Sequence, residues 1–154
     1  MSDPLPESAL ERILDAVDMI EDCLGRLVEI RNATDRETYR ADPNTQAIVE
    51  RRFVTMTEAA LDIGRVLIVH ERGDPPETNP ETMRTLSELE VLSDDVATEM
   101  VDAARFRNVL AHIYGPSIDH DLVYDALDDL TRYRDFTVEV RSYLEQIGAL
   151  DPEA

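Results

Sequence analysis

Five residues able to bind an anion or move a proton lie within ten positions of one another: Arg105, Arg107, Asn108, His112 and Tyr114. An imidazole titrates near neutral pH, so it can accept or donate a proton. A guanidinium stays charged and holds phosphate oxygens through two parallel hydrogen bonds. Residues of these types suit proton transfer and charge stabilisation at an anionic ester such as a phosphodiester.

This cluster occupies the last turns of an expected helix. Gly115 tolerates a left-handed turn and Pro116 cannot continue a helix, so the pair predicts where the helix ends. Burying an unpaired charge is costly, so Arg107 must meet an acid or face a lined pocket. It falls on a helical stripe with small or apolar neighbours, namely Met100, Ala104, Ala111 and Tyr114.

His112 follows Arg107 by five residues, which is about 140° round an ideal helix. It lies instead on a polar line with Arg105 and Asn108, so the two groups flank one edge of the helix. A long arginine could bridge that gap, or a partner chain could complete the site. The small side chains on the Arg107 stripe would let another helix or a second subunit approach closely.

From spacing alone, structural roles are favoured over catalytic ones for these residues. A histidine in the last turn, such as His112, suits the negative end of the helix dipole. Arg107 could form a buried ion pair, and Tyr114 could be a half-buried anchor. An arginine and a histidine five residues apart are a weak motif with many false positives. We assign the other two histidines, His70 and His120, to structural or solvent roles.

The length of 154 residues predicts a single domain over 1–154, with a core from about 8 to 148. No window approaches 18 consecutive apolar residues, and Met1 is not followed by the basic and apolar segments of a signal peptide. The single cysteine, Cys23, cannot form an internal disulfide and is expected in the core. We therefore expect a cytoplasmic protein.

The charge balance is strongly acidic, with 34 acids against 15 bases and a net charge of −19. Every base is an arginine and the chain has no lysine. We interpret this acidity as adaptation to a salty cytoplasm, as in a halophile. An acidic surface argues against nucleic-acid binding, because phosphate contacts need cations. High ionic strength weakens that objection, because it shortens the distance over which charges act.

Apolar residues recur at alternating spacings of three and four along most of the chain, and no strand-like alternation interrupts them. Ser93 and Asp119 are suitable N-caps, and Gly148 is suited to end the last helix. The sequence predicts an all-α fold, an antiparallel helical bundle of four long helices plus one short helix. The expected helices cover 8–31, 46–70, 81–92 (the short one), 93–113 and 119–147, with a loop over 32–45.

The segment Arg107-Asn108-Val109-Leu110-Ala111-His112-Ile113-Tyr114 resembles the Arg-X4-6-His signature of the HEPN superfamily, which has a polar residue after the arginine. More narrowly, Arg-X4-His-X-Tyr followed by Gly is similar to the HepT-like ribonuclease toxins. The resemblance extends over about 8–148. It includes the helix from 48 to 67 with Glu50-Arg51 near its start, the short helix before Ser93, and the continuation from 119 to 127.

The resemblance implies a HEPN-like helical bundle working as a homodimer that cleaves RNA without a metal or cofactor. Arg107 and His112 would be the catalytic pair, with Asn108 as their polar companion. Tyr114 would match the tyrosine that an MntA-type nucleotidyltransferase antitoxin modifies with AMP. Arg105 departs from the expected small or variable residue, and it is either a second phosphate contact or a surface charge.

Two other hypotheses stay open. The chain could be a non-catalytic HEPN dimer that serves as a scaffold or binding companion for a nucleotidyltransferase, although the intact Arg107, Asn108, His112 and Tyr114 set favours activity. It could also be a helical interaction domain whose Ala104 and Ala111 stripe only dimerises. The chain lacks the sequence features of a nucleotidyltransferase, a P-loop, a dinucleotide-binding turn, a zinc pattern or a hydrolase elbow.

Overall fold

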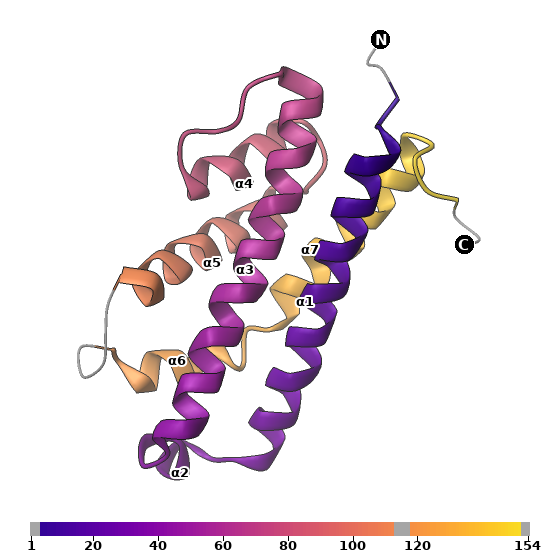
Figure 1. The fold of residues 1–154 in the computed structure, drawn as a ribbon. Helices are drawn as coiled ribbons and strands as arrows, with labels where there is room; N and C mark the ends of the chain where they lie inside the picture. Colours follow the sequence, from indigo (N-terminus) through magenta and orange to yellow (C-terminus); the bar gives the residue numbers. More distant parts are fainter. Residues whose placement is uncertain (1–3, 113–117, 152–154) are drawn as a thin grey trace.

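Seven helices make up the fold over residues 4–112 and 118–151, the ranges that the computed structural model describes (Figure 1). Four are long, and their bounds are α1 Glu7–Ala33, α3 Pro43–Arg72, α5 Asp94–His112 and α7 Thr131–Gln146. Three are short: α2 Arg36–Arg40, α4 Asn79–Glu88 and α6 His120–Ala126. The predicted all-α class is confirmed, and α1, α3 and α5 match three of the four predicted long helices, whereas the structure has three short helices where the sequence predicted one. Within the described ranges, no helix combines the length and apolarity needed to cross a membrane.

The long helices α1 and α3 run antiparallel along most of the molecule, with α7 behind α1 and the α4–α5 pair on the other side of α3 (Figure 1). Their apolar stripes meet in one core, to which α1 contributes Ile13, Ile20 and Leu27, each fully buried. A hydrogen bond within this core joins the Thr57 hydroxyl of α3 to the Tyr133 hydroxyl of α7, 2.7 Å apart. Burial of the apolar stripes drives the assembly.

Side chains at the helix ends bear out the predicted caps. The Asp119 carboxylate accepts backbone N–H bonds from Asp121 and Leu122, at 3.1 and 3.2 Å, and so begins α6. The Ser93 hydroxyl accepts from the N–H of Val96 at 3.3 Å at the start of α5. Gly148 has φ 76° just after α7, a left-handed conformation that glycine adopts without strain. The predicted stop at Gly115-Pro116 lies outside the described residues.

The predicted loop over 32–45 is wrong in part, because it contains α2 and the start of α3. Asp35 caps α2 by accepting from the N–H of Thr38 at 2.8 Å. Pro43, which falls within the predicted loop, is the first residue of α3. A proline fits there because its missing N–H would have no partner in the first turn of a helix.

The expected continuous helix over 119–147 is also wrong, because residues 127–130 separate α6 from α7. Leu127 and Leu130 continue the apolar rhythm, so periodicity alone does not reveal the break. The backbone tightens there instead: the N–H of Asp128 bonds to the carbonyl of Asp125, and that of Asp129 to Ala126, each three residues back. Paired aspartates favour such a change because they are poor helix formers.

Gly64 on α3 sets how closely α4 can approach. A Cβ at this position would lie 2.6 Å from the Thr82 Cγ2 atom and 3.2 Å from the Leu86 Cδ1 atom, both on α4. Thr82 is buried and β-branched, so its methyl group has little freedom to move aside. The absence of a side chain at Gly64 therefore holds α4 against α3.

Replacing Gly64 with Ala is expected to lower the free energy of unfolding by about 1–3 kcal/mol, because the new methyl overpacks the α3–α4 contact. Urea denaturation followed by circular dichroism measures the change. Gly25 on α1 is the matched control, because a Cβ there would meet nothing within 4 Å. Its change to Ala should stabilise the protein by up to about 1 kcal/mol through helix propensity. Equal effects at both glycines would contradict the proposed close contact.

Candidate functional site

The C-terminal half of α5 carries the site that the sequence predicted, and its buried face fixes the direction of the polar residues. Ala103 and Ala104 are fully buried, which lets α5 pack closely against its neighbours. Phe106 packs edge-on against Phe53 of α3, with ring centroids 5.4 Å apart. Because Phe106 is held in this way, the next two residues emerge where α5 faces α3 and α4.

Arg107 pairs there with an acid, Glu58. An acid partner was one of the two environments that the sequence predicted for this arginine. Its Nη2 donates to the Glu58 Oε1 atom of α3 at 2.5 Å, and its Nη1 donates to the Asn108 Oδ1 atom at 3.2 Å. The Arg107 side chain is 20% exposed, whereas the Glu58 side chain is half-exposed. The Nε of Arg107 is buried and has no acceptor among the described residues. Glu58 and Asn108 thus hold the guanidinium through its two Nη atoms, while the Nε–H donor is unused.

Two further residues extend this contact into a row. Asn79, the first residue of α4, donates from Nδ2 to the Asn108 Oδ1 atom at 3.0 Å. Arg65 of α3 donates from Nη2 to the Asn79 Oδ1 atom at 3.2 Å. We call Arg65, Asn79, Asn108, Arg107 and Glu58 the polar row. It joins three helices, and sequence analysis singled out only the two members that lie on α5.

The sequence gives little indication of the other three members. Glu58 lies off the apolar line of its helix, and Asn79 falls in what the sequence presents as a loop. Neither feature points to α5. The partner of Glu58, Arg107, follows 49 positions later, and the partner of Asn79, Asn108, follows 29 positions later. Only the packing of α3 and α4 on α5 brings these groups together.

The other predicted site residues are placed as follows. His112 is the last residue of α5 and is exposed, one turn beyond Asn108. No hydrogen bond or ion pair joins it to Arg107 within the described part of the chain. Arg105 is exposed and lines a separate hollow between α4 and α5, beside Arg84 and Asp102. Tyr114 lies outside the described residues.

The next described helix along the chain is α6, and two sets of ionisable groups hold it against α2 and α3. The His120 Nδ1 atom lies 3.6 Å from the Glu50 Oε2 atom of α3. Burial raises the pKa of Glu50, and the neighbouring His120 opposes that shift. Asp121 accepts two hydrogen bonds from Arg40, at 2.7 and 3.0 Å, and these bonds lower the pKa of Asp121. His120 thus has the structural role expected of it.

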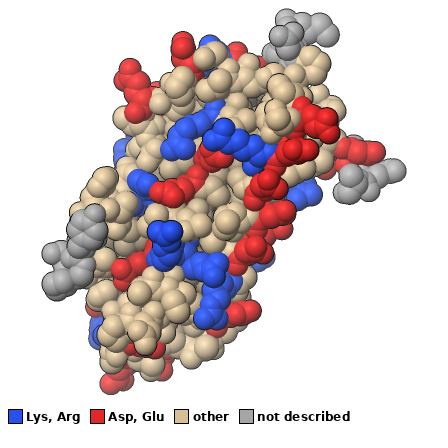
Figure 2. Space-filling view, in the orientation of Figure 1, with Lys and Arg blue, Asp and Glu red and all other residues tan. Residues whose placement is uncertain are grey.

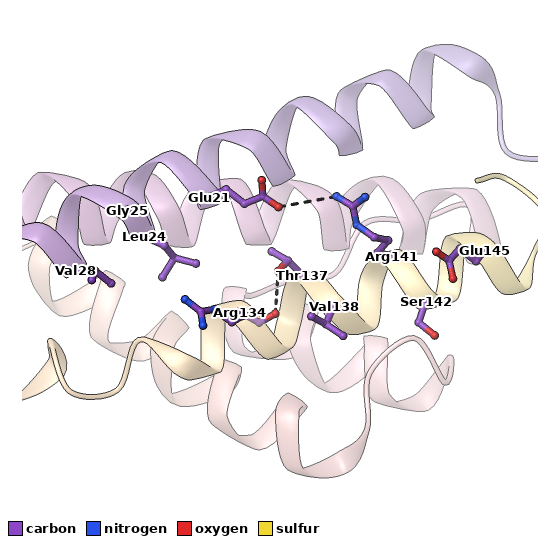
Figure 3. Close-up of a pocket in the computed structure, with 10 residues that line it drawn as sticks. All are labelled: Glu21, Leu24, Gly25, Val28, Arg134, Thr137, Val138, Arg141, Ser142 and Glu145. Atoms are coloured by element: carbon purple, nitrogen blue, oxygen red, sulfur yellow. Dashed lines mark hydrogen bonds and ion pairs between the residues drawn. The ribbon is translucent and has the colours of Figure 1, made fainter. Parts of the chain in front are cut away.

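Another hollow lies between α1 and α7, on a different part of the surface (Figure 3). Figure 3 shows Leu24 and Val28 of α1 facing Thr137 and Val138 of α7, with arginines and glutamates along the edges. None of the predicted site residues that the structure describes lines this groove. The groove is therefore not part of the site on α5.

The described residues form an all-α helical bundle, with an arginine, a polar residue and a histidine at the end of one helix, α5. Comparison with known proteins gives the family within that class. The chain belongs to the ribonuclease HepT-like family, whose model matches residues 20–140. The resemblance drawn from Arg107 through Tyr114 is thereby confirmed.

Individual relatives agree with this assignment. The chain is 28% identical over 109 residues to a tRNA nuclease HepT of Aphanizomenon flos-aquae, covering 70% of this chain and 74% of that protein. Its fold matches a tri-AMPylated HEPN toxin of Shewanella oneidensis in complex with an MNT antitoxin, with a TM-score of 0.76 and 17% identity over 85% of this chain and 97% of the other. It also matches YutE of Bacillus subtilis, a cytosolic protein of unknown function, with a TM-score of 0.68 and 22% identity over 85% and 92% of the two chains.

Proposed function

We propose that the protein is a metal-independent endoribonuclease toxin whose partner, an MntA-type nucleotidyltransferase antitoxin, neutralises it by transferring AMP to Tyr114. The observation that carries this proposal is the end of α5 in a chain of the ribonuclease HepT-like family. There, Arg107 and Asn108 are held in place by other side chains, while His112 is open to solvent one turn away.

RNA supplies its own nucleophile, so the protein has only to move protons and stabilise charge. In the proposed reaction, the 2′-oxygen attacks the adjacent phosphorus while the His112 imidazole takes the hydroxyl proton. The bond from phosphorus to the 5′-oxygen breaks, and an imidazolium, from this subunit or its symmetry mate, protonates the leaving oxygen. Arg107 stabilises the negative charge that develops on the non-bridging oxygens. Asn108 fixes the Arg107 side chain and offers its own N–H groups.

The working unit of the proposal is a homodimer in which two α5 helices approach each other. Val109 is 46% exposed, and it lies on α5 between Arg105 and His112. A large apolar side chain in that position suits a contact with another subunit. We place Arg105 among the proposed phosphate contacts only as an outer one, because it lines a hollow apart from the polar row.

The acidic surface limits which RNA the protein would bind. Figure 2 shows acidic and basic side chains interleaved on one face of the described structure, without a broad basic field. We therefore propose a narrow substrate choice and action in a salty cytoplasm, where a net charge of −19 repels RNA less. A tRNA is a suitable class of substrate, because the relative from Aphanizomenon flos-aquae is a tRNA nuclease.

AMP transfer to Tyr114 would inactivate the site through both bulk and charge. The tyrosine oxygen would attack the α-phosphorus of ATP and release pyrophosphate, leaving an anionic adduct two residues from His112. Arg107 could pair with that phosphate, so the adduct would occupy the place of the RNA. The AMPylated Shewanella oneidensis toxin in its complex with an antitoxin supports this regulation.

The purified protein is expected to cut RNA in high salt and in the presence of EDTA. Gel analysis of a labelled tRNA pool measures the cleavage. Loss of cleavage on adding EDTA, with recovery on adding a divalent metal, would contradict the metal-free mechanism. Intact-mass measurement after co-expression with an MntA-type nucleotidyltransferase should show an adduct that the Tyr114→Phe variant lacks. A tight complex with no adduct would favour inhibition by occlusion alone.

The non-catalytic HEPN scaffold is the alternative function, and the Arg107–Glu58 ion pair is the observation that favours it, because a guanidinium already bound to a carboxylate is less available to substrate. This alternative predicts a stable complex with the nucleotidyltransferase and no cleavage of RNA by the free protein. The digestion described above decides between the two functions.

A further inference from the structure

Arg65 differs from Arg107 in what it contacts, although both belong to the polar row. The Arg107 guanidinium pairs with the Glu58 carboxylate. Arg65 forms a hydrogen bond with the Asn79 amide oxygen and has no carboxylate partner among the residues that the structure describes. The nearest acid one turn back on α3, Asp62, is already paired with Arg12 of α1. Arg65 therefore leaves the polar row with one net positive charge in a strongly acidic chain.

Within the polar row, the hydrogen bonds of the two arginines and two asparagines leave donors, not acceptors, to meet a ligand. The Asn79 oxygen accepts from Arg65, and the Asn108 oxygen accepts from both Asn79 and Arg107. Because an arginine can only donate, the oxygens of both amides must face the arginines. The Asn108 Nδ2 group has no acceptor among the described residues, and the buried Arg107 Nε has none either. Among the arginine and asparagine side chains of the row, the unused hydrogen-bonding groups are N–H groups; the only carboxylate, Glu58, is paired with Arg107 through Oε1.

We propose that Arg65 is a second phosphate-binding residue, so that the polar row binds two neighbouring phosphates of one RNA strand. A phosphodiester offers only acceptor oxygens and a negative charge, and both complement a row with surplus donors and a net positive charge. Arg107 holds the phosphate at which cleavage occurs, whereas Arg65 holds the next one and makes no contact with the reacting atoms. The proposal rests on the proposed ribonuclease function and deepens it by naming a substrate contact on α3.

The charges predict how binding changes when Arg65 is replaced with Gln. Glutamine can still donate to the Asn79 oxygen, so the tie between α3 and α4 is kept, but the row becomes neutral. Affinity for a 2′-deoxy-substituted, uncleavable RNA oligonucleotide should fall about 10- to 150-fold at low salt, the loss of one charge-assisted hydrogen bond. The slope of log affinity against log salt should become shallower by about 0.7, as expected for one lost contact to a single strand. For cleavable RNA, KM should rise while kcat stays the same.

Two further variants separate a local phosphate contact from the effects of net charge and of side-chain shape. Arg134→Gln removes the same charge from α7, where Arg134 lines the groove of Figure 3. It should leave the salt slope unchanged, because its charge lies away from the polar row. Arg65→Lys keeps the charge but loses the paired donors, so it should retain the slope and recover part of the affinity. The urea midpoint of Arg65→Gln should equal that of the wild type.

The results separate this proposal from the proposed function. If the wild-type protein cleaves RNA and the Arg65→Gln variant shows the same KM and the same salt slope, the second phosphate contact is overturned. The nuclease function then remains intact. The same slope change in the Arg65 and Arg134 variants would also overturn it, as would a lowered urea midpoint without loss of binding. Binding that depends on Arg65 in a protein that cuts no RNA would support the contact and remove the nuclease function.

Discussion

Replacing His112 with Ala is expected to reduce the rate of RNA cleavage by about 10²- to 10⁴-fold, the usual contribution of a positioned acid–base group. The fold should be unaffected, because His112 is exposed at the end of α5 and forms no hydrogen bond with the other described residues. Any change in the interaction with the helix dipole should cost less than about 1 kcal/mol. Initial rates on a fixed tRNA substrate, measured beside urea denaturation, test both parts of this prediction.

Arg107→Ala should cause a comparable loss of cleavage, and Arg107→Lys should restore little of it. Lysine keeps the charge, but it cannot offer paired donors to phosphate oxygens. His70→Gln is the matched histidine control, because His70 lies near the C-terminal end of α3, beside Glu71, and belongs neither to the polar row nor to the end of α5. It should keep full activity. Cleavage at the wild-type rate by both the His112 and Arg107 variants would remove the assigned site.

Phe53→Ala is expected to lower the free energy of unfolding by about 3–5 kcal/mol, a large part of the stability of an ordinary domain. Phe53 is fully buried on α3. Its ring contacts Phe106 of α5 edge-on and Tyr133 of α7, with centroids 5.4 and 6.4 Å apart. The substitution therefore opens a cavity where three helices meet. Denaturation monitored by circular dichroism gives the change in free energy.

The same variant connects packing with the site, because Phe106 directly precedes Arg107. Cleavage by Phe53→Ala should fall even at temperatures where the variant is folded, since α5 loses the ring that fixes its rotation. Val138→Ala is the control, because Val138 is 61% exposed on α7 and its loss should cost less than about 0.5 kcal/mol. A change of under 1 kcal/mol for Phe53→Ala would show that the described core contact is not formed.

The caps and turns show how far local sequence determines the helices. Asp119, Ser93 and Gly148 act where their side chains, or the lack of one, satisfy or permit a nearby backbone conformation. Such effects depend on residues a few positions apart, so the sequence predicts them. The sequence does not reveal the helix boundaries within 32–45, because Pro43 can begin a helix as well as interrupt one. It does not reveal the break at 127–130 either, because the three-four spacing of apolar residues continues across those positions.

The candidate site divides in the same way. By itself, the sequence determined the all-α class, three of the long helices, and the placing of Arg107, Asn108 and His112 on one helix end, since residues on one helix keep a fixed spacing and angle. Only the tertiary structure decided that Glu58 neutralises Arg107 and that Arg65 and Asn79 extend the site. Those contacts depend on how α3 and α4 are rotated and shifted against α5. That placement comes from the shapes of buried side chains such as Phe53 and from the space at Gly64, and no local pattern encodes it.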